Sequence, residues 1–160
     1  MLKPLLTVVG VGALVGILWP GGHSAPPARA RPTAAAATDE RPRETLLKRH
    51  DDGHFYADVE VNGELVHFLV DTGATSVALT EEDAQRVGIA FSPSQFDEVG
   101  MGAGGPIRGK IVTIDRISLD GKKAEGVHGA IIEGATLSLL GQAYLSRLNV
   151  EMNGDYMRLN

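Results

Sequence analysis

A carboxylate ends an apolar run in this sequence, and a glycine follows it two residues later. Residues 67–80 read HFLVDTGATSVALT, in which Asp71 comes directly after the continuously apolar residues 68–70. Gly73 lets the backbone turn sharply, so the chain can leave a buried strand with the Asp71 carboxylate at the bottom of a groove, while the Thr72 hydroxyl is free to bond a neighbouring backbone group. If Asp71 met a second carboxylate, one of the two would hold a proton near neutral pH. The pair would then supply a general acid beside a general base, with a water between them.

The stretches on both sides of Asp71 have the periodicity of β-strands. Residues 54–70 alternate between apolar and polar side chains and then become continuously apolar, which predicts a hairpin that leads into a more buried strand. Residues 110–119 predict a long strand, and the glycine-rich segment 100–109 before it predicts the tip of a second long hairpin. Three dipeptides mark tight turns: Asn62-Gly63, Asp120-Gly121 and Asn153-Gly154.

Helical signals are confined to two short segments. Thr80 with Asp83 three residues later resembles a helix start and Gly88 resembles a stop, so residues 81–87 predict a short helical turn. Residues 142–148 have helical apolar spacing and predict one convincing helix near the C-terminus. The domain is therefore expected to be mostly β.

The chain is expected to have three parts. Residues 1–20 contain the uninterrupted apolar run 5–19 and predict an N-terminal hydrophobic anchor or signal segment. Residues 21–44 are rich in Pro and Ala without apolar periodicity, which predicts a linker. Residues 45–160 form the folded domain, which is long enough for one core but not for two lobes.

The N-terminal segment leaves two alternatives open, an uncleaved anchor and a cleaved signal peptide. Its apolar run is shorter than the roughly 20 residues of a usual membrane-spanning helix, although flanking residues can extend it. Residues 28–30 (Ala-Arg-Ala) have the form of a cleavage site but lie far beyond the run. We favour an anchor with the folded domain on the periplasmic or extracytoplasmic side. Lys3 favours this orientation, and the arginines of the linker oppose it.

Composition argues against several classes of function. The chain has no cysteine, which excludes a disulfide scaffold, a thiol nucleophile and cysteine metal sites. Its five histidines form no close ligand pair, so we expect no metal, and nothing in the sequence indicates another cofactor. The formal net charge of -5 and the lack of a basic stripe with interleaved aromatic residues argue against nucleic acid as a partner.

These motifs, in this order, resemble those of the retroviral-type (retropepsin-like) aspartic proteases. Residues 71–74 (Asp-Thr-Gly-Ala) look like the catalytic triplet of that family with its usual following alanine. The hairpin expected at 100–109 lies where such proteases carry a flap. Residues 139–141 (Leu-Leu-Gly), ahead of the terminal helix, look like the second signature of the family. Membrane-tethered bacterial members share this layout of anchor, linker and single protease domain.

The resemblance implies a fold, an activity and a set of site residues. The fold would be a single-lobe closed β-barrel with a glycine-rich flap hairpin and one short C-terminal helix. The protein would be an endopeptidase without a cofactor, which hydrolyses peptide bonds with a water activated by the paired Asp71 residues of a homodimer. The catalytic residues would be Asp71, Thr72 and Gly73. The substrate-binding residues would be Ala74, Gly102, Ala103, Gly104 and Gly105.

One chain contains only one such motif, so the resemblance requires a second copy. Residues 119–121 (Leu-Asp-Gly) lack the intervening Ser or Thr and lie at an expected turn, which excludes a two-lobed monomer. We expect a twofold homodimer in which Asp71 and its mate face each other across the axis. An extended protein or peptide substrate would lie between the flaps and the floor, bound strand-fashion by backbone groups.

Two other hypotheses remain open from the sequence. Asp71, Gly73 and Thr75 also fit the D-x-G-x-T pattern of the phosphate-binding turn in sugar kinases and actin-like ATPases. Such folds need two α/β domains and more than twice this length. A domain with the protease shape could also bind peptide without cleaving it, because an intact motif does not show how two chains are aligned.

Overall fold

The computed structural model describes the chain over residues 41–102 and 104–160. The anchor or signal segment predicted at 1–20 and most of the linker predicted at 21–44 lie outside these residues. In the described part of the chain, no helix is long and apolar enough to span a membrane.

The described residues are mostly β, as the sequence predicts. The strands in chain order are β1 (Thr45–Lys48), β2 (Tyr56–Val61), β3 (Glu64–Val70), β4 (Val77–Leu79), β5 (Asp97–Gly102), β6 (Gly105–Leu119), β7 (Lys122–Ile132), β8 (Ser138–Leu140), β9 (Val150–Asn153) and β10 (Tyr156–Leu159). The helices are α1 (Glu81–Arg86), the 3-10 helix η1 (Pro93–Gln95) and α2 (Gln142–Leu145).

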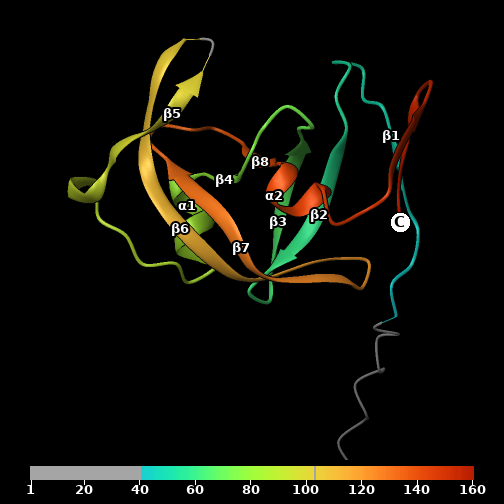
Figure 1. Cartoon of the computed structure of the whole chain (residues 1–160), viewed down its shortest axis with the longest axis horizontal. Coiled ribbons are helices and arrows are strands. Elements are labelled where there is room, and N and C mark those ends of the chain that lie inside the picture. Colours follow the sequence, from blue (N-terminus) through green and yellow to red (C-terminus); the bar gives the residue numbers. More distant parts are fainter. Residues whose placement is uncertain (1–40, 103) are drawn as a thin grey trace, which may run out of the picture. The chain divides into compact units, whose positions relative to one another are not determined.

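Six strands close into a barrel. Their order is β2-β3-β8-β4-β7-β6, and a second pairing of β2 with β6 closes the ring. β5 pairs only with β6, so the β5–β6 hairpin extends away from the barrel, on the side opposite β1 in Figure 1. The closed, mostly β fold expected from the sequence is confirmed.

A separate antiparallel sheet joins the two ends of the domain. Its order is β1-β10-β9, with β10 in the centre. The β9–β10 hairpin lies at the C-terminal turn that the sequence predicts. The sequence analysis did not predict β1 as a strand, because four residues of mixed polarity carry little periodicity and pairing with β10 is a long-range event.

Two of the predicted tight turns are confirmed in place. Asn62 and Gly63 both have positive φ, of 51° and 97°. Asp120 and Gly121 also both have positive φ, of 49° and 78°. Positive φ at both loop positions is the pattern of a type I′ turn, whose twist matches that of the flanking strands.

The third turn lies one residue later than predicted. Asn153 pairs with Tyr156, so the two loop residues are Gly154 and Asp155 rather than Asn153 and Gly154. Gly154 has a φ of 58°. Glycine with positive φ at the first loop position is typical of a type II′ turn, and this preference outweighs the Asn-Gly signal.

The two halves of the barrel repeat one pattern. Residues 66–79 (VHFLVDTGATSVAL) and 127–140 (VHGAIIEGATLSLL) share Val-His, Gly-Ala-Thr and a final leucine at the same spacing. The strand before each turn, β3 or β7, pairs in parallel with the short strand after the other turn, β8 or β4. The two turns therefore occupy equivalent positions. The first carries Asp71 where the second carries Ile132.

Large side chains from both halves fill the barrel. Phe68, Leu79 and Leu140 are fully buried, and burial of a side chain of this size contributes about 1.5–3 kcal/mol. Tyr144 of α2 is also fully buried, and its hydroxyl donates to the Lys122 carbonyl oxygen at 2.6 Å. Burial raises the pKa of Tyr144 to about 12, so the hydroxyl remains a neutral donor.

The C-terminal helix is shorter than the predicted 142–148. α2 ends at Leu145, and the Ser146 hydroxyl donates back to the Gln142 carbonyl oxygen at 2.6 Å, an interaction that competes with helix continuation. Asn149 then exchanges backbone hydrogen bonds with Asn160, of 2.9 and 3.0 Å, which commit the chain to a strand. The short helix predicted at 81–87 is confirmed to within one residue as α1.

A side chain at Gly141 should destabilise the fold. A Cβ there would lie 2.1 Å from the Ser76 carbonyl oxygen and 2.7 Å from that of Ala74. We expect Gly141→Ala to lower the free energy of unfolding by at least about 1–3 kcal/mol, because backbone atoms would have to move. Urea unfolding followed by circular dichroism measures this loss. Gly100→Ala is the matched control, since its Cβ would meet nothing within 4 Å, and equal losses in both variants would contradict the argument.

Candidate active site

Asp71 follows the last residue of β3, at the point where that strand leaves the barrel. The Asp71 backbone N–H donates to the Leu140 carbonyl oxygen at 3.1 Å, and the Val70 N–H donates to that of Phe55 at 2.9 Å. These two bonds fix the backbone on both sides of the strand end. The Asp71 residue is only half-buried, so its carboxylate remains accessible from outside the barrel.

The turn after Asp71 folds back on the carboxylate. The Gly73 N–H donates to Asp71 Oδ1 at 2.8 Å, and the Ala74 N–H donates to the Asp71 carbonyl oxygen at 3.3 Å. A Cβ on Gly73 would lie 3.2 Å from Asp71 Oδ1, tighter than an ordinary contact. Glycine at this position therefore leaves room for the carboxylate to be held by a backbone amide.

The start of α2 holds this turn from the opposite side. The Gln142 N–H donates to the Ala74 carbonyl oxygen at 2.8 Å, and the Ala143 N–H donates to that of Thr75 at 2.9 Å. The Gln142 side chain adds a third bond, from Nε2 to the Thr72 carbonyl oxygen at 2.8 Å. The sequence analysis missed Gln142. Its signal was its position directly after the Leu-Leu-Gly motif, at the first turn of the predicted helix.

A recess of about 270 Å³ opens beside Asp71 and Thr72. Its other walls come from the loop between β1 and β2, from the end of β3 and from the C-terminal sheet, where Met152 and Met157 contribute. The recess combines the Asp71 carboxylate with the polar side chains of Arg49 and His54 and with apolar side chains such as Met152, a mixed composition that suits a side chain or backbone segment of a peptide.

Arg49 joins several walls of this recess. Its guanidinium donates to the Gly53 carbonyl oxygen at 2.8 Å and to the Gly154 carbonyl oxygen at 3.0 Å. It also lies over the Phe55 ring, 4.5 Å from the ring centroid. One side chain thus connects the C-terminal hairpin with the loop whose Phe55 carbonyl oxygen accepts from Val70.

The predicted flap glycines line a different recess. Gly102 pairs with Gly105 at the end of the β5–β6 hairpin, and Gly102, Gly104 and Gly105 line a concavity of about 520 Å³ together with Ile132 and Glu133. Ala103 lies outside the described residues. The structure therefore places Asp71, Thr72, Gly73 and Ala74 in one turn, and it places the described flap glycines together in another part of the domain.

The base of this hairpin is fastened by Arg108. Its guanidinium bonds Glu133 Oε2 at 3.0 Å and the Phe96 carbonyl oxygen at 2.9 Å. The Glu133 N–H donates to the Arg108 carbonyl oxygen at 2.9 Å. β6 pairs with β7 only from Gly109 onward, so Arg108 stands at the fork where the hairpin leaves the barrel.

Loss of the Arg108 side chain should loosen the hairpin. We expect Arg108→Gln to speed hydrogen exchange of residues 97–107 roughly fivefold, as a net loss of about 1 kcal/mol of hydrogen bonding implies. Hydrogen-exchange mass spectrometry measures this rate. Arg116→Gln changes an arginine on the barrel part of the same strand and is the matched control. If exchange in 97–107 is the same in both variants, Arg108 does not fasten the hairpin.

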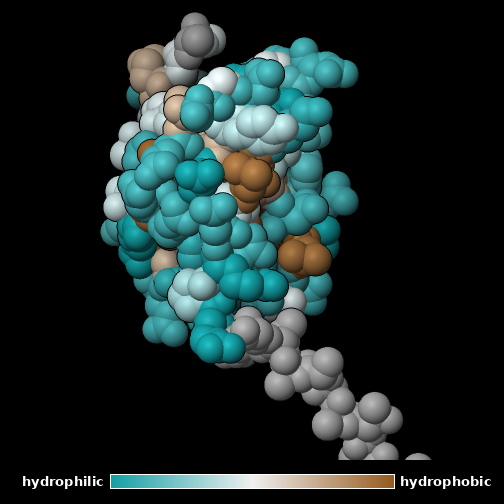
Figure 2. Space-filling model, turned by 90° about the vertical axis from the view of Figure 1, so that its right-hand side faces the viewer, coloured by the Kyte–Doolittle hydropathy of each residue, from teal (hydrophilic) through white to brown (hydrophobic). Residues whose placement is uncertain are grey.

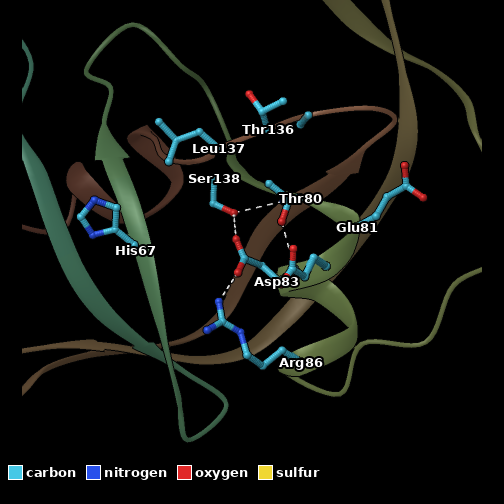
Figure 3. A pocket seen from close by; sticks show the side chains of 10 residues that line it. His67, Thr80, Glu81, Asp83, Arg86, Thr136, Leu137 and Ser138 are labelled. Atoms are coloured by element: carbon cyan, nitrogen blue, oxygen red, sulfur yellow. Dashed lines mark hydrogen bonds and ion pairs between the residues drawn. The ribbon is translucent and has the colours of Figure 1, made fainter. Parts of the chain in front are cut away.

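A third concavity, of about 580 Å³, lies beside α1 (Figure 3). Asp83 lies at the centre of its hydrogen-bond network and accepts from the Ser138 hydroxyl at 2.5 Å and from Arg86. Ser138 Oγ in turn accepts from the Thr80 N–H at 3.1 Å, and Thr80 Oγ1 accepts from the Asp83 N–H at 3.0 Å. Because the Asp83 carboxylate is already bonded to its neighbours, this network caps α1 and ties it to β8, and we assign it a structural role.

The Asp83 network should make stability depend on pH. Burial alone would raise the pKa of Asp83, but hydrogen bonds from Ser138, Arg86 and Thr80 outweigh it and hold this pKa below its ordinary value. The charged form therefore stabilises the fold above the ordinary value of about 3.9, and this contribution is lost as the pH falls through the lower folded value.

We expect Asp83→Asn to cost about 1–3 kcal/mol of unfolding free energy at pH 7, since Ser138 and Arg86 lose a charged partner. The difference from wild type should shrink below about pH 4, where the carboxylate of the unfolded wild-type chain is protonated. Thermal unfolding between pH 3 and pH 7, values that bracket the ordinary Asp pKa, measures both effects. Glu82→Gln, at an exposed neighbouring position, is the control. A difference that stays constant over this range would contradict the assignment.

The chemistry available at Asp71 is that of a single carboxylate. In the described part of the chain, no group of three or more His, Asp or Glu residues is placed to hold a metal ion. An isolated carboxylate can accept or donate one proton. Two of them sharing a water can divide the roles of base and acid.

Comparisons with known proteins agree with this geometry. Residues 57–147 match the family described as “gag-polyprotein putative aspartyl protease”. An uncharacterized protein of Rickettsia prowazekii is 30% identical over 119 residues, which are 73% of this chain and 51% of that protein. An uncharacterized protein of a Sinorhizobium species is 33% identical over 130 residues, which are 79% of this chain and 56% of that protein. The chain therefore spans about half the length of these two relatives.

The domain also resembles a solved structure. The crystal structure of a retropepsin-like aspartic protease from Rickettsia conorii is similar to it with a TM-score of 0.62 and 30% sequence identity. The similarity covers 73% of this chain and 90% of that one, so it includes nearly all of the solved domain.

Proposed function

The chain belongs to the retropepsin-like aspartic protease family, and on that premise we propose that it is an aspartic endopeptidase that acts through Asp71. The observation that carries the proposal is the Asp71 turn itself. An accessible carboxylate at a strand end accepts from the Gly73 amide, and the start of α2 holds the following residues in place. A family whose chemistry needs a fixed carboxylate beside a water accounts for this arrangement.

We propose that the active form is a homodimer with one Asp71 from each chain. Among the described residues, the turn equivalent to 71–74 in the other half of the barrel carries Ile132 and Glu133, so one chain does not supply a second Asp-Thr-Gly. In the dimer, one Asp71 is charged and accepts a proton from water, while the other is protonated and donates to the peptide carbonyl oxygen. Thr72 and Gly73 position the pair, and no cofactor takes part.

The substrate in this proposal is an extended stretch of protein. Ala74 offers backbone groups beside the carboxylates, and the hairpin with Gly102, Ala103, Gly104 and Gly105 closes over the bound chain as a flap. The recess beside Asp71 accommodates one side chain of the peptide. The phosphate-binding alternative needs two α/β domains, whereas the described domain is one β-barrel with short helices.

We further propose that residues 1–20 tether the domain to a membrane and that the domain lies on the periplasmic or extracytoplasmic side. The support is the apolar run 5–19 followed by a Pro- and Ala-rich segment. In this arrangement, residues 21–44 act as a spacer between the membrane and the folded domain.

The shared site predicts that Asp71→Asn chains inactivate wild-type chains. When equal amounts of both exchange at random, about one quarter of the dimers carry two Asp71 residues, and activity per wild-type chain should fall to about half. Cleavage of fluorescein-labelled casein at fixed wild-type concentration, above the dimer dissociation constant, measures this fall. The mixed dimer retains one ionisable acid and cannot divide the two roles.

The mixing experiment requires proof of subunit exchange, which chains labelled with two different fluorophores provide. Asp58→Asn, an exposed aspartate on β2, is the matched control and should leave activity per wild-type chain unchanged on mixing. If exchange is confirmed and Asp71→Asn chains also leave it unchanged, each chain works alone and the dimeric mechanism is wrong.

A further inference from the structure

The asparagine at position 153 is not required by the turn that follows it. The loop residues of that turn are Gly154 and Asp155, and Asn153 is the last residue of β9. A strand end accepts most residue types, whereas Asn62 in the other Asn-Gly pair has a φ of 51°, a conformation that favours asparagine. The structure of the turn therefore does not explain why asparagine precedes glycine at 153–154.

An asparagine that precedes glycine can lose its side-chain amide without an enzyme. The backbone nitrogen of the glycine attacks the side-chain carbonyl carbon, a nitrogen–carbon bond forms, and ammonia leaves with the proton of that nitrogen. Water then opens the resulting succinimide ring at one of its two carbonyl groups, which gives aspartate or isoaspartate. Glycine permits the attack because it has no Cβ to hinder the approach. The asparagine side chain must also be able to rotate toward the backbone nitrogen.

The side chain of Asn62 is restrained against this rotation. Its Nδ2 donates to the Val87 carbonyl oxygen at 3.2 Å, and its Oδ1 accepts from the Arg116 N–H at 3.1 Å. Asn62 is also half-buried. Both hydrogen bonds would have to break before the side-chain carbonyl carbon could reach the Gly63 nitrogen.

The two Asp-Gly pairs of the described residues are restrained as well. An aspartate can form the same ring with loss of water in place of ammonia. Asp52 accepts from the Tyr56 hydroxyl at 2.6 Å, and the Gly53 N–H already donates to a backbone carbonyl oxygen at 2.9 Å. Asp120 accepts from the Thr45 hydroxyl at 2.5 Å. In each pair, a group needed for ring closure is held by another partner.

Asn153-Gly154 has no such restraint. Both residues are exposed, and within residues 41–102 and 104–160 neither the Asn153 side chain nor the Gly154 N–H makes a hydrogen bond. The C-terminal hairpin that carries them is red in Figure 1, and Figure 2 views the molecule from the side on which this hairpin lies. Hydrophilic residues predominate on that side, so water can reach the hairpin.

We propose that Asn153 is a deamidation site of this protein, and that its isoaspartate product detaches the C-terminal turn from Arg49. The reaction needs only water, and it releases ammonia. The inference goes beyond the proposed function and does not rest on it, because it concerns a chemical change at a position outside the Asp71 turn.

Arg49 depends on the turn that follows Asn153. Its guanidinium donates to the Gly154 carbonyl oxygen at 3.0 Å, and its backbone N–H donates to that of Asp155 at 2.7 Å. Isoaspartate places an additional carbon atom in the backbone directly before a two-residue loop that is closed by the pairing of Asn153 with Tyr156. Because loop length determines the geometry of such a turn, both carbonyl groups shift and Arg49 loses partners.

The loss at Arg49 extends to the candidate site. Arg49 lines the recess beside Asp71, and its segment leads into the loop between β1 and β2. Isoaspartate at position 153 therefore loosens one wall of this recess. The aspartate product keeps the ordinary backbone, so it leaves the turn and its bonds to Arg49 in place.

Mass spectrometry of the ageing protein gives the first test. Full-length protein is incubated at neutral pH, and the peptides that contain positions 62 and 153 are compared over time. We expect position 153 to deamidate about tenfold faster or more than position 62, because two hydrogen bonds must break at Asn62 first. In the urea-unfolded chain, where these bonds are absent, the two rates should become similar. Equal rates in the folded protein would overturn the proposal.

Hydrogen exchange tests the consequence for Arg49. Aged protein with isoaspartate at position 153, detected by its reaction with isoaspartyl methyltransferase, is compared with fresh protein. We expect residues 49–55 to exchange about fivefold faster in the aged form, as the net loss of one hydrogen bond implies.

Two variants separate the backbone change from the change in charge. Asn153→Asp adds the charge without the additional backbone atom and should exchange like fresh wild type. Asn153→Gln keeps an amide but must close a larger ring, so incubation for the same time should not speed its exchange. If Asn153→Asp speeds exchange of residues 49–55 as much as ageing does, or if isoaspartate leaves this exchange unchanged, the detachment of Arg49 is wrong. Neither measurement uses proteolysis, so both results are independent of the proposed function.

Discussion

Two backbone amides at the start of α2 hold the turn that carries Asp71, and the geometry of the site depends on them. They donate to the carbonyl oxygens of Ala74 and Thr75, while Gly141 allows the helix to approach the turn without a side chain in the way. α2 itself has only four residues, too few to be stable alone. It is ordered because Tyr144 and Leu145 are buried in the barrel. The core therefore stabilises a short helix, and that helix fixes the turn that carries Asp71.

The two halves of the barrel repeat one sequence pattern, but the two turns carry different side chains at equivalent positions. Each half places a Gly-Ala-Thr turn after a long strand, and each turn is held by elements of the other half. The first turn presents Asp71. The second turn is preceded by Glu133, which pairs with Arg108 and fastens the β5–β6 hairpin. The same backbone geometry thus presents the Asp71 carboxylate in one half and anchors the β5–β6 hairpin in the other.

Sequence patterns predicted the parts of this structure that depend on local chemistry. Strand alternation, the type I′ turns at 62–63 and 120–121 and the cap at Thr80 are all set by neighbouring residues, and each is present in the structure. Contacts between distant segments were missed. The pairing of β1 with β10, the Arg108–Glu133 ion pair and the Gln142–Thr72 bond each join residues that no short window contains.

The same distinction applies to the candidate site: the part set by neighbouring residues was predicted, and the part built from distant segments was not. The placement of Asp71 at a strand end followed from an apolar run, an acid and a glycine, which are adjacent in the sequence. The recess beside Asp71 could not be predicted in this way, because its walls come from distant segments: the loop between β1 and β2, the end of β3 and the C-terminal hairpin. The internal repeat is present in the sequence at a spacing of 61 residues (66 to 127), but only a few residues are identical between its two copies. The repeat becomes clear once β3 is seen to pair with β8 and β4 with β7.

Arg49 gives the recess a thermodynamic connection to the C-terminal hairpin. One guanidinium bonds the carbonyl oxygens of Gly53 and Gly154 and stacks on Phe55, whose backbone supports the strand end before Asp71. Events that order the hairpin therefore also order a wall of the recess. By the reciprocity of linked equilibria, a peptide-like ligand seated beside Asp71 would favour the ordered hairpin by the same factor by which the ordered hairpin favours binding of that ligand. Conditions that loosen the C-terminal hairpin would then weaken ligand binding in the recess to the same extent.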